Sequence, residues 1–147
     1  MKRILVALDQ SPRAVDVLAR ASAIAKATGA QLYLFHAVGL PSGIPADAFR
    51  ASPNELVEIW KLEAVRDLER RAGSVDPVVV THVLVHIGQP WASICAAARE
   101  NDVDLIVIGS HGHEMLDRVL GTTAAKVVNH ADRSVLVVRS PTPGASV

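Results

Sequence analysis

Short apolar runs alternate along this chain with segments whose apolar residues recur at helical spacing, and this alternation constrains the fold more than any other feature. The runs are rich in Val, Ile and Leu, which is typical of strands buried on both faces. Alternating strands and helices favour a parallel sheet with right-handed crossovers and helices on both faces. The sequence therefore predicts an α/β fold with an open, doubly wound, five-stranded parallel sheet. The strands are expected at residues 3–8, 31–38, 78–87, 105–108 and 134–138.

Capping residues indicate where the intervening helices begin and end. Ser11 and Pro12 are typical of an N-cap and a first helical residue, and Gly29 is typical of a C-terminal stop. Ser52 and Glu55 form a capping box for a second helix. The helices are expected at about residues 12–28, 53–72, 91–101 and 122–131. The Pro and Gly residues of 39–51 predict a surface loop.

Length and composition predict a single domain over residues 1–140 and a flexible tail over residues 141–147. The 15 Lys and Arg balance the 15 Asp and Glu, and aromatic residues make up 3% of the chain, so no nucleic-acid-binding surface is expected. Cys95 is the only cysteine, which fits a reducing cytosol. The apolar run after Met1 is too short for a signal peptide and is interrupted by Asp9, and no segment has the length of a membrane span. We therefore expect a cytoplasmic protein without membrane insertion.

Two glycine clusters lie between the fourth predicted strand and the fourth predicted helix. Gly109 and Gly112 follow the strand directly, and Gly121, Thr122 and Thr123 stand at the start of the helix. The N-terminus of a helix presents unpaired N–H groups and a partial positive charge to an anion. Glycines allow the backbone to approach a ligand closely. This order of elements predicts a phosphate-binding site.

Two other strand ends are expected at the same edge of the sheet. Ligands of open parallel sheets bind beyond the carboxyl ends of the strands, where the strand order reverses. The first strand ends at Ala7, Leu8 and Asp9, and the second ends at His36 and Ala37. A carboxylate repels phosphates unless a metal intervenes, so Asp9 is expected at the sugar or base end of a bound nucleotide. Asp9 alternatively begins the cap of the first helix.

The spacer between the two glycine clusters, residues 113–120, is eight residues long. Together with other segments in the same order, it makes the chain similar to universal stress proteins of the UspA type. ATP-binding members of that family carry G-x-x-G, about nine residues, and then G-[S/T] before a helix, so the spacer here is one residue shorter. Other family-like features are the first strand ending in Asp9, the second strand with His36, the turn Gly88-x-Pro90, and the ending 131–139.

The resemblance implies a Rossmann-like fold of the adenine-nucleotide alpha hydrolase type with strand order 3-2-1-4-5. It also implies bound ATP with Mg²⁺ or Mn²⁺ bridging the phosphates, and a two-fold homodimer through Ser134–Val138. Ala7, Leu8 and Asp9 would border the adenine and the ribose, and Ala37 would bind adenine through its backbone. Residues of the glycine region would line the ribose and the phosphates: Gly109, His111, Gly112, Gly121, Thr122 and Thr123.

The glycine-region residues also have a purely structural interpretation. Gly109 and Gly112 are alternatively turn glycines that need a positive φ. Gly121, Thr122 and Thr123 are alternatively no more than a helix cap. Taken together, their spacing favours a binding site.

Several other polar residues are interpreted as structural. His82 and His86 share one face of a strand but lie too far apart for easy joint ligation, so ordinary polar positions are favoured over a metal site. Cys95 is expected to be a small core residue, because no pattern marks an activating partner. Arg118 is expected to be solvated, although it could reach a terminal phosphate.

These features favour a stress-response protein that binds ATP and shifts its conformation or its partners with the nucleotide. The sequence contains no GxxxxGK[ST] loop, which excludes a P-loop ATPase, and no GxGxxG follows a strand. Asp9, Glu114 and Asp117 are the only acidic residues near the expected site, so no catalytic residue is assigned and any ATP hydrolysis should be slow. Two alternatives stay open, namely a slow ATP-hydrolysing or adenylyl-transferring enzyme and a nucleotide-free dimeric interaction module. The sequence predicts no particular protein partner.

Overall fold

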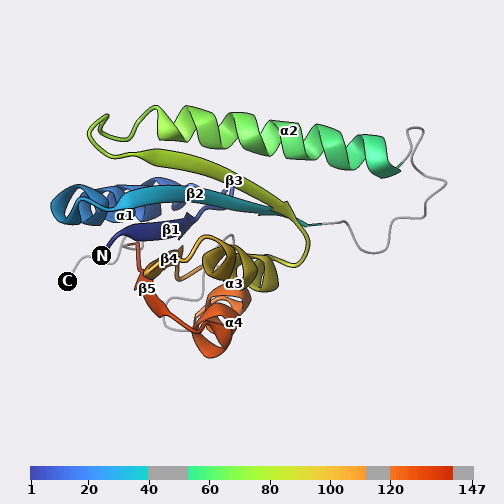
Figure 1. Ribbon diagram of the computed structural model, residues 1–147. Helices are drawn as coiled ribbons and strands as arrows, with labels where there is room; N and C mark the ends of the chain where they lie inside the picture. Colours follow the sequence, from blue (N-terminus) through green and yellow to red (C-terminus); the bar gives the residue numbers. More distant parts are fainter. Residues whose placement is uncertain (40–52, 112–119, 141–147) are drawn as a thin grey trace.

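The computed structural model describes residues 1–39, 53–111 and 120–140, which form an alternating series of strands and helices (Figure 1). Most of the predicted loop at 39–51, the capping residue Ser52 and the predicted tail lie outside the described residues. The elements are β1 (Arg3–Ala7), α1 (Ala14–Thr28), β2 (Gln31–Val38), α2 (Pro53–Ala72), β3 (Thr81–Ile87), α3 (Pro90–Glu100), β4 (Leu105–Gly109), α4 (Thr122–His130) and β5 (Ser134–Val138).

The strands form one parallel sheet in the order β3-β2-β1-β4-β5, which confirms the predicted fold class and strand order. β1 pairs with β2 on one side and with β4 on the other, so the direction in which strands are added reverses at β1. Asp104 helps to set the register of β1 against β4, because its carboxylate accepts the backbone N–H groups of Lys2 (2.6 Å) and Arg3 (2.9 Å). These two hydrogen bonds lower the pKa of Asp104. The two strands on either side of the strand order reversal are therefore tied together at their amino ends.

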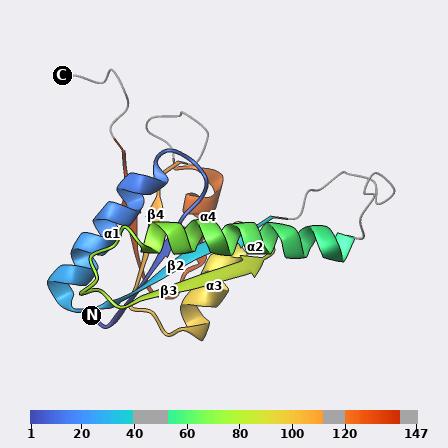
Figure 2. The same ribbon diagram turned by 90° about the horizontal axis from the view of Figure 1, so that it is seen from above.

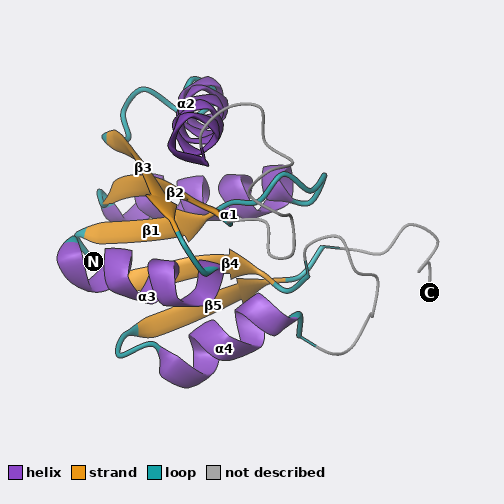
Figure 3. Cartoon of the chain, turned by 90° about the vertical axis from the view of Figure 1, so that its right-hand side faces the viewer, coloured by secondary structure: helices purple, strands orange, loops and turns teal. Residues whose placement is uncertain are grey.

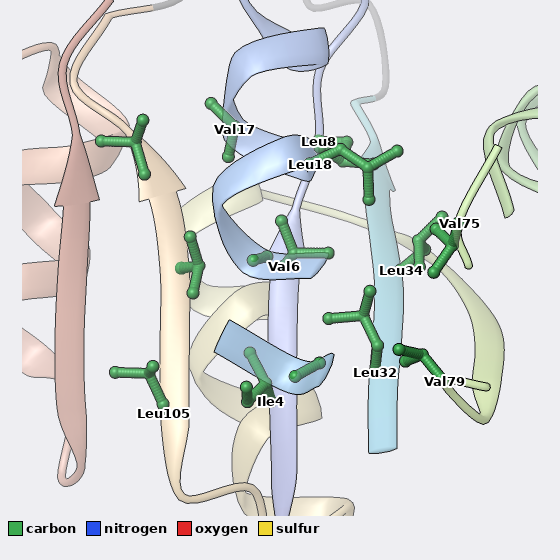
Figure 4. Close-up of a cluster of buried hydrophobic side chains, with 14 of the residues drawn as sticks. Ile4, Val6, Leu8, Val17, Leu18, Leu32, Leu34, Val75, Val79 and Leu105 are labelled. Atoms are coloured by element: carbon green, nitrogen blue, oxygen red, sulfur yellow. The ribbon is translucent and has the colours of Figure 1, made fainter. Parts of the chain in front are cut away.

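Helices cover both faces of the sheet, as the alternating pattern predicts (Figures 2 and 3). On the face of α1 and α2, residues Ile4 and Val6 of β1 pack with Leu34 of β2 (Figure 4). On the face of α3 and α4, Leu5 of β1 packs with Phe35 of β2 and with further residues of the two helices. Successive side chains of a strand point to opposite faces, so an uninterrupted apolar run fills both cores.

Two predicted boundaries are wrong by a few residues. α1 begins at Ala14 rather than at Pro12, since Ser11 and the residues after it form a turn in which Ser11 O accepts the N–H of Ala14 (3.1 Å). Ser11 makes no side-chain cap; the N-cap residue is Arg13. The predicted helix stop at Gly29 is confirmed, because this residue has the left-handed φ of 72° that glycine adopts without strain.

The third strand begins at Thr81, three residues later than predicted. Asp76 makes a turn there, since its carboxylate accepts the N–H of Val78 (3.0 Å) and its carbonyl accepts the N–H of Val79 (2.9 Å). Val78 is consequently exposed and Val79 is buried. The predicted strand therefore began too early, because the first residues of the apolar run belong to a turn that Asp76 stabilises.

The sheet ends at β3 on one side and at β5 on the other, as the implied strand order 3-2-1-4-5 requires. Among the residues that the structure describes, no helix is both long enough and apolar enough to span a membrane.

Candidate nucleotide-binding site

A pocket of about 320 Å³ opens at the carboxyl ends of β1 and β4, where the strand order reverses. Its volume lies within the range of about 300–1,000 Å³ that is usual for small-molecule sites. The strands β1, β2 and β4 and the first turns of α1, α3 and α4 all contribute to its walls. The lining residues are Ala7, Leu8, Asp9, Ser11, Arg13, Ala14, Val17, Phe35, His36, Ala37, Pro90, Ile94, Ile108, Gly109, Ser110, His111, Gly121, Thr122, Thr123 and Ala124.

The predicted site residues converge on this pocket. Gly112 lies outside the described residues, as do His113, Glu114, Asp117 and Arg118. Whether the converging residues bind a nucleotide stays a prediction at this point. The predicted residues in the lining are Ala7, Leu8, Asp9, Ala37, Gly109, His111, Gly121, Thr122 and Thr123.

One wall of the pocket is formed where the glycine segment leaves β4 and returns to α4. The N–H of Ser110 donates to Val138 O of β5 (2.9 Å), and the N–H of Gly121 donates to Ser110 O (2.7 Å). The second bond joins the two ends of the segment directly. It places the N-terminus of α4, with Thr122 as its first residue, at the pocket.

Close packing favours glycine at two positions of this wall. A Cβ atom on Gly109 would lie 3.1 Å from Val17 Cγ2, and one on Gly121 would lie 3.1 Å from Ser110 O. The alternative that Gly109 needs a positive φ is wrong, because the described glycines with positive φ are Gly29 and Gly88. Gly121 is the N-cap residue of α4 and has an ordinary φ of −59°, and the start of the helix has no side-chain cap.

Asp9 both borders the pocket and stabilises the turn after β1. Its side chain lies in the lining, and its Oδ1 atom accepts the N–H of Ser11 (2.9 Å). The alternative that Asp9 begins the cap of the first helix is wrong, because the N-cap residue of α1 is Arg13 and the contact of Asp9 belongs to the turn before it. The two roles are compatible, since a carboxylate has two oxygen atoms that each accept more than one hydrogen bond.

At the end of β2, the backbone of Ala37 faces the pocket. Phe35 O accepts the N–H of Leu8 (2.8 Å), so Phe35 presents its backbone groups toward β1. Val38 O accepts the N–H of Gly88 (3.0 Å), on the opposite side, toward β3. Backbone groups alternate between the two sides of a strand, so Ala37 presents its N–H and C=O on the side of Phe35, beyond the last residue of β1.

Two histidines tie the strand ends and loops of the pocket together. His36 Nδ1 lies 2.8 Å from Leu8 O and joins β2 to the end of β1. His111 is 7% exposed, and its Nδ1 lies 3.1 Å from Ser110 Oγ. These contacts give both residues a role in the shape of the pocket.

Sequence reasoning missed Ser11 and Arg13 as pocket residues. Both lie on the turn between β1 and α1, and Ser11 carries the signal of a helix cap. Arg13 is the N-cap residue just before α1, and Val17 in the first turn of α1 lies beside Gly109. No local sequence signal places Arg13 at the pocket.

The histidines of β3 and the cysteine make contacts within the fold and lie outside the pocket lining. His82 stacks on Tyr33 with ring centroids 4.6 Å apart, and His86 Nε2 lies 3.9 Å from Glu100 Oε2. Within residues 1–39, 53–111 and 120–140, no group of three or more His, Cys, Asp and Glu is placed to hold a metal ion. Cys95 is buried, and burial raises the pKa of its thiol, so the interpretation as a core residue agrees with the structure.

Comparison with known proteins gives a consistent result over almost the whole chain. The sequence model of the universal stress protein family matches residues 1–139. The universal stress protein A homolog 2 of Coxiella burnetii is 34% identical over 139 residues, which cover 94% of both chains.

Solved structures show the same likeness. The universal stress protein UspA from Lactobacillus plantarum has a TM-score of 0.76 and 27% identity, with 94% of this chain and 97% of that chain covered. The universal stress protein from Archaeoglobus fulgidus in complex with dAMP has a TM-score of 0.60 and 26% identity, with 93% and 97% covered.

Proposed function

This chain belongs to the universal stress protein family, and from that premise and the geometry of its pocket we propose that it binds ATP as a nucleotide-dependent regulatory protein of the stress response. Adenine and ribose lie at the ends of β1 and β2, and the phosphates lie against the N-terminus of α4. We also propose that the protein is located in the cytoplasm. A solved relative with 26% identity holds dAMP, which supports an adenine nucleotide as the class of ligand.

The observation that carries the proposal is the start of α4 in the pocket wall. Thr122, Thr123 and Ala124 are the first residues of the helix and line the pocket. Their N–H groups precede the first intrahelical hydrogen bonds, and no side chain caps this end of the helix. Unpaired N–H groups and the positive end of the helix dipole stabilise a phosphate by several charge-assisted hydrogen bonds.

The opposite end of the pocket fits a base and a sugar. Val17, Phe35, Ile94 and Ile108 provide apolar walls for a flat ring system. The exposed N–H and C=O edge of Ala37 offers one donor and one acceptor, which matches the edge of adenine. Asp9 then lies at the ribose, where its charge is kept away from the phosphates.

A divalent cation at this site would be coordinated mainly by phosphate oxygens of the nucleotide and only in small part by protein groups. Mg²⁺ and Mn²⁺ prefer oxygen ligands, and such ions commonly bind through phosphate oxygens with few protein groups. Asp9 is the carboxylate of the described pocket lining, and no three His, Cys, Asp or Glu among the described residues are placed to hold a metal ion. Among the protein groups, the hydroxyls of Thr122 and Thr123 would complete the shell of an ion bridging the phosphates, and the ion would neutralise phosphate charge.

The test is a calorimetric titration of the freshly purified protein with ATP, ADP and AMP, after analysis of any nucleotide that the protein releases on denaturation. We expect saturable binding of ATP with a rise in melting temperature, since a ligand that binds only the folded state stabilises it. Titration with GTP is the control for base selectivity. Absence of both heat and a thermal shift with all three adenine nucleotides would show that the pocket does not serve this ligand.

We further propose that two copies pair through β5. This strand is at the edge of the sheet, so one row of its backbone N–H and C=O groups has no neighbouring strand among the described residues. Three of its five residues are Val, and exposed apolar edges are usually covered. Sedimentation at micromolar concentration should give twice the chain mass of 15.6 kDa. A mass of one chain would rule out the dimer.

A further inference from the structure

Arg13 brings a positive charge into the wall of the pocket. The residue lines the pocket directly before α1 and is half-buried, so part of it stays accessible. Of the described pocket-lining residues, Arg13 is the only Lys or Arg, and Asp9 is the only Asp or Glu. A guanidinium group is charged at neutral pH and carries five N–H donors. Such a group in a pocket wall favours an anionic ligand.

Arg13 and the start of α4 lie on opposite sides of the carboxyl end of β4. Arg13 O accepts the N–H of Val17 (3.2 Å), so Arg13 is one turn before Val17, which lies beside Gly109. α1 and α4 cover opposite faces of the sheet (Figure 3), and the first residues of both helices line the pocket. A phosphate chain over the end of β4 would therefore have Thr122 on one side and Arg13 on the other.

The start of α1 reinforces the charge of Arg13. Ala14 is the first residue of α1 and lines the pocket, and no side chain caps this end of the helix. The positive end of the helix dipole therefore acts on the same region as the guanidinium group. The carboxylate of Asp9 is held at the preceding turn by the N–H of Ser11 (2.9 Å), where the proposed function places the ribose. The two charges of the described lining thus serve different parts of the ligand.

We propose that the guanidinium group of Arg13 binds the phosphates of the nucleotide from the side of α1 and makes the affinity rise with the number of phosphates. This inference rests on the proposed function and specifies which adenine nucleotide the site prefers. Coulomb attraction increases with the charge of the ligand, and a guanidinium group forms paired hydrogen bonds with phosphate oxygens. ATP should therefore bind more tightly than AMP, and AMP more tightly than adenosine.

The experiment titrates ATP, AMP and adenosine into the wild type, Arg13→Ala, Arg13→Lys and Arg20→Ala by calorimetry with Mg²⁺ present. Arg20→Ala is the matched control, since it removes the same charge from an exposed position of α1 outside the pocket lining. We expect Arg13→Ala to bind ATP about ten- to a hundredfold more weakly, as loss of a charged hydrogen-bonding group does. Its affinity for AMP should fall less, and its affinity for adenosine should not change.

Two further readouts test the role of the charge. Arg13→Lys keeps the charge without the planar fork, so its ATP affinity should lie between those of the wild type and Arg13→Ala. Added NaCl should weaken ATP binding by the wild type more than by Arg13→Ala, because salt screens the attraction that the variant lacks.

Three results would overturn the inference. The first is that the wild type binds AMP as tightly as ATP. The second is that Arg13→Ala binds ATP as tightly as Arg20→Ala does. The third is that Arg13→Ala weakens ATP and adenosine equally, which would place the side chain at the base or the sugar. If the wild type binds none of the three ligands, the proposed function itself fails.

Discussion

Leu34→Ala is expected to lower the free energy of unfolding by about 2–5 kcal/mol, because it creates a cavity at the centre of the sheet. Leu34 lies on β2, opposite Val6 of β1 and Val83 of β3, and its side chain is fully buried. It belongs to the cluster of buried apolar side chains on the face of α1 and α2, part of which Figure 4 shows. The surrounding strands are held in register on both sides, so they cannot collapse into the space that the side chain leaves.

The loss is large relative to the total stability of a domain of this size, which is usually about 5–15 kcal/mol. It should be measured by urea denaturation without nucleotide, since bound nucleotide would stabilise both proteins by mass action. Val15→Ala is the matched control, because Val15 is on α1 and is 65% exposed. A loss below about 1 kcal/mol for Leu34→Ala would contradict the tightly packed core described above.

The layers of the fold were predictable because each depends on a repeated signal. The structure has the alternation of strands and helices that the sequence indicates. It also ends α1 at Gly29, as predicted. Strand and helix starts were less predictable, since a turn is determined by single side chains such as Asp76. An apolar run alone does not show which of its first residues belong to such a turn and which to the strand.

The pocket was predictable where backbone geometry defines it and unpredictable where side-chain direction does. Gly121 and Thr122 could be placed because a helix must begin there, and helix starts have a local signature. Ser11 has the same signature, yet its hydroxyl is buried beside the pocket and does not cap α1. A serine that caps a helix and a serine that lies in the turn before it have the same local sequence. They differ only in whether the helix begins one residue or three residues after the serine.

Thr122→Asp is expected to weaken ATP binding by roughly a hundredfold or more, because it places a negative charge where the phosphates are proposed to lie. Two unit charges about 4 Å apart repel by about 1 kcal/mol in water and about 4 kcal/mol near a protein surface, and ATP carries several charges. Thr122 is the first residue of α4, is exposed and lines the pocket. Gly121 is a poorer choice for this test, since any side chain there would approach Ser110 O within 3.1 Å.

The same substitution should not destabilise the ligand-free protein. An aspartate in the first turn of a helix is favourable by about 0.3–1 kcal/mol, because its charge complements the helix dipole. The melting temperature without nucleotide should therefore stay equal or rise, while the rise caused by ATP disappears. This opposite movement distinguishes a lost phosphate site from a damaged fold.

Two controls separate charge from shape. Thr122→Asn has nearly the same size as the aspartate variant without its charge, so it should retain most of the ATP affinity. Adenosine lacks phosphates, so Thr122→Asp should bind it as the wild type does. Titrations with and without Mg²⁺ are needed, because an aspartate at this position could share a bound cation and partly offset the repulsion. Unchanged ATP binding by Thr122→Asp in both conditions would mean that the phosphates do not lie at α4, and the orientation of the nucleotide proposed above would have to be reversed.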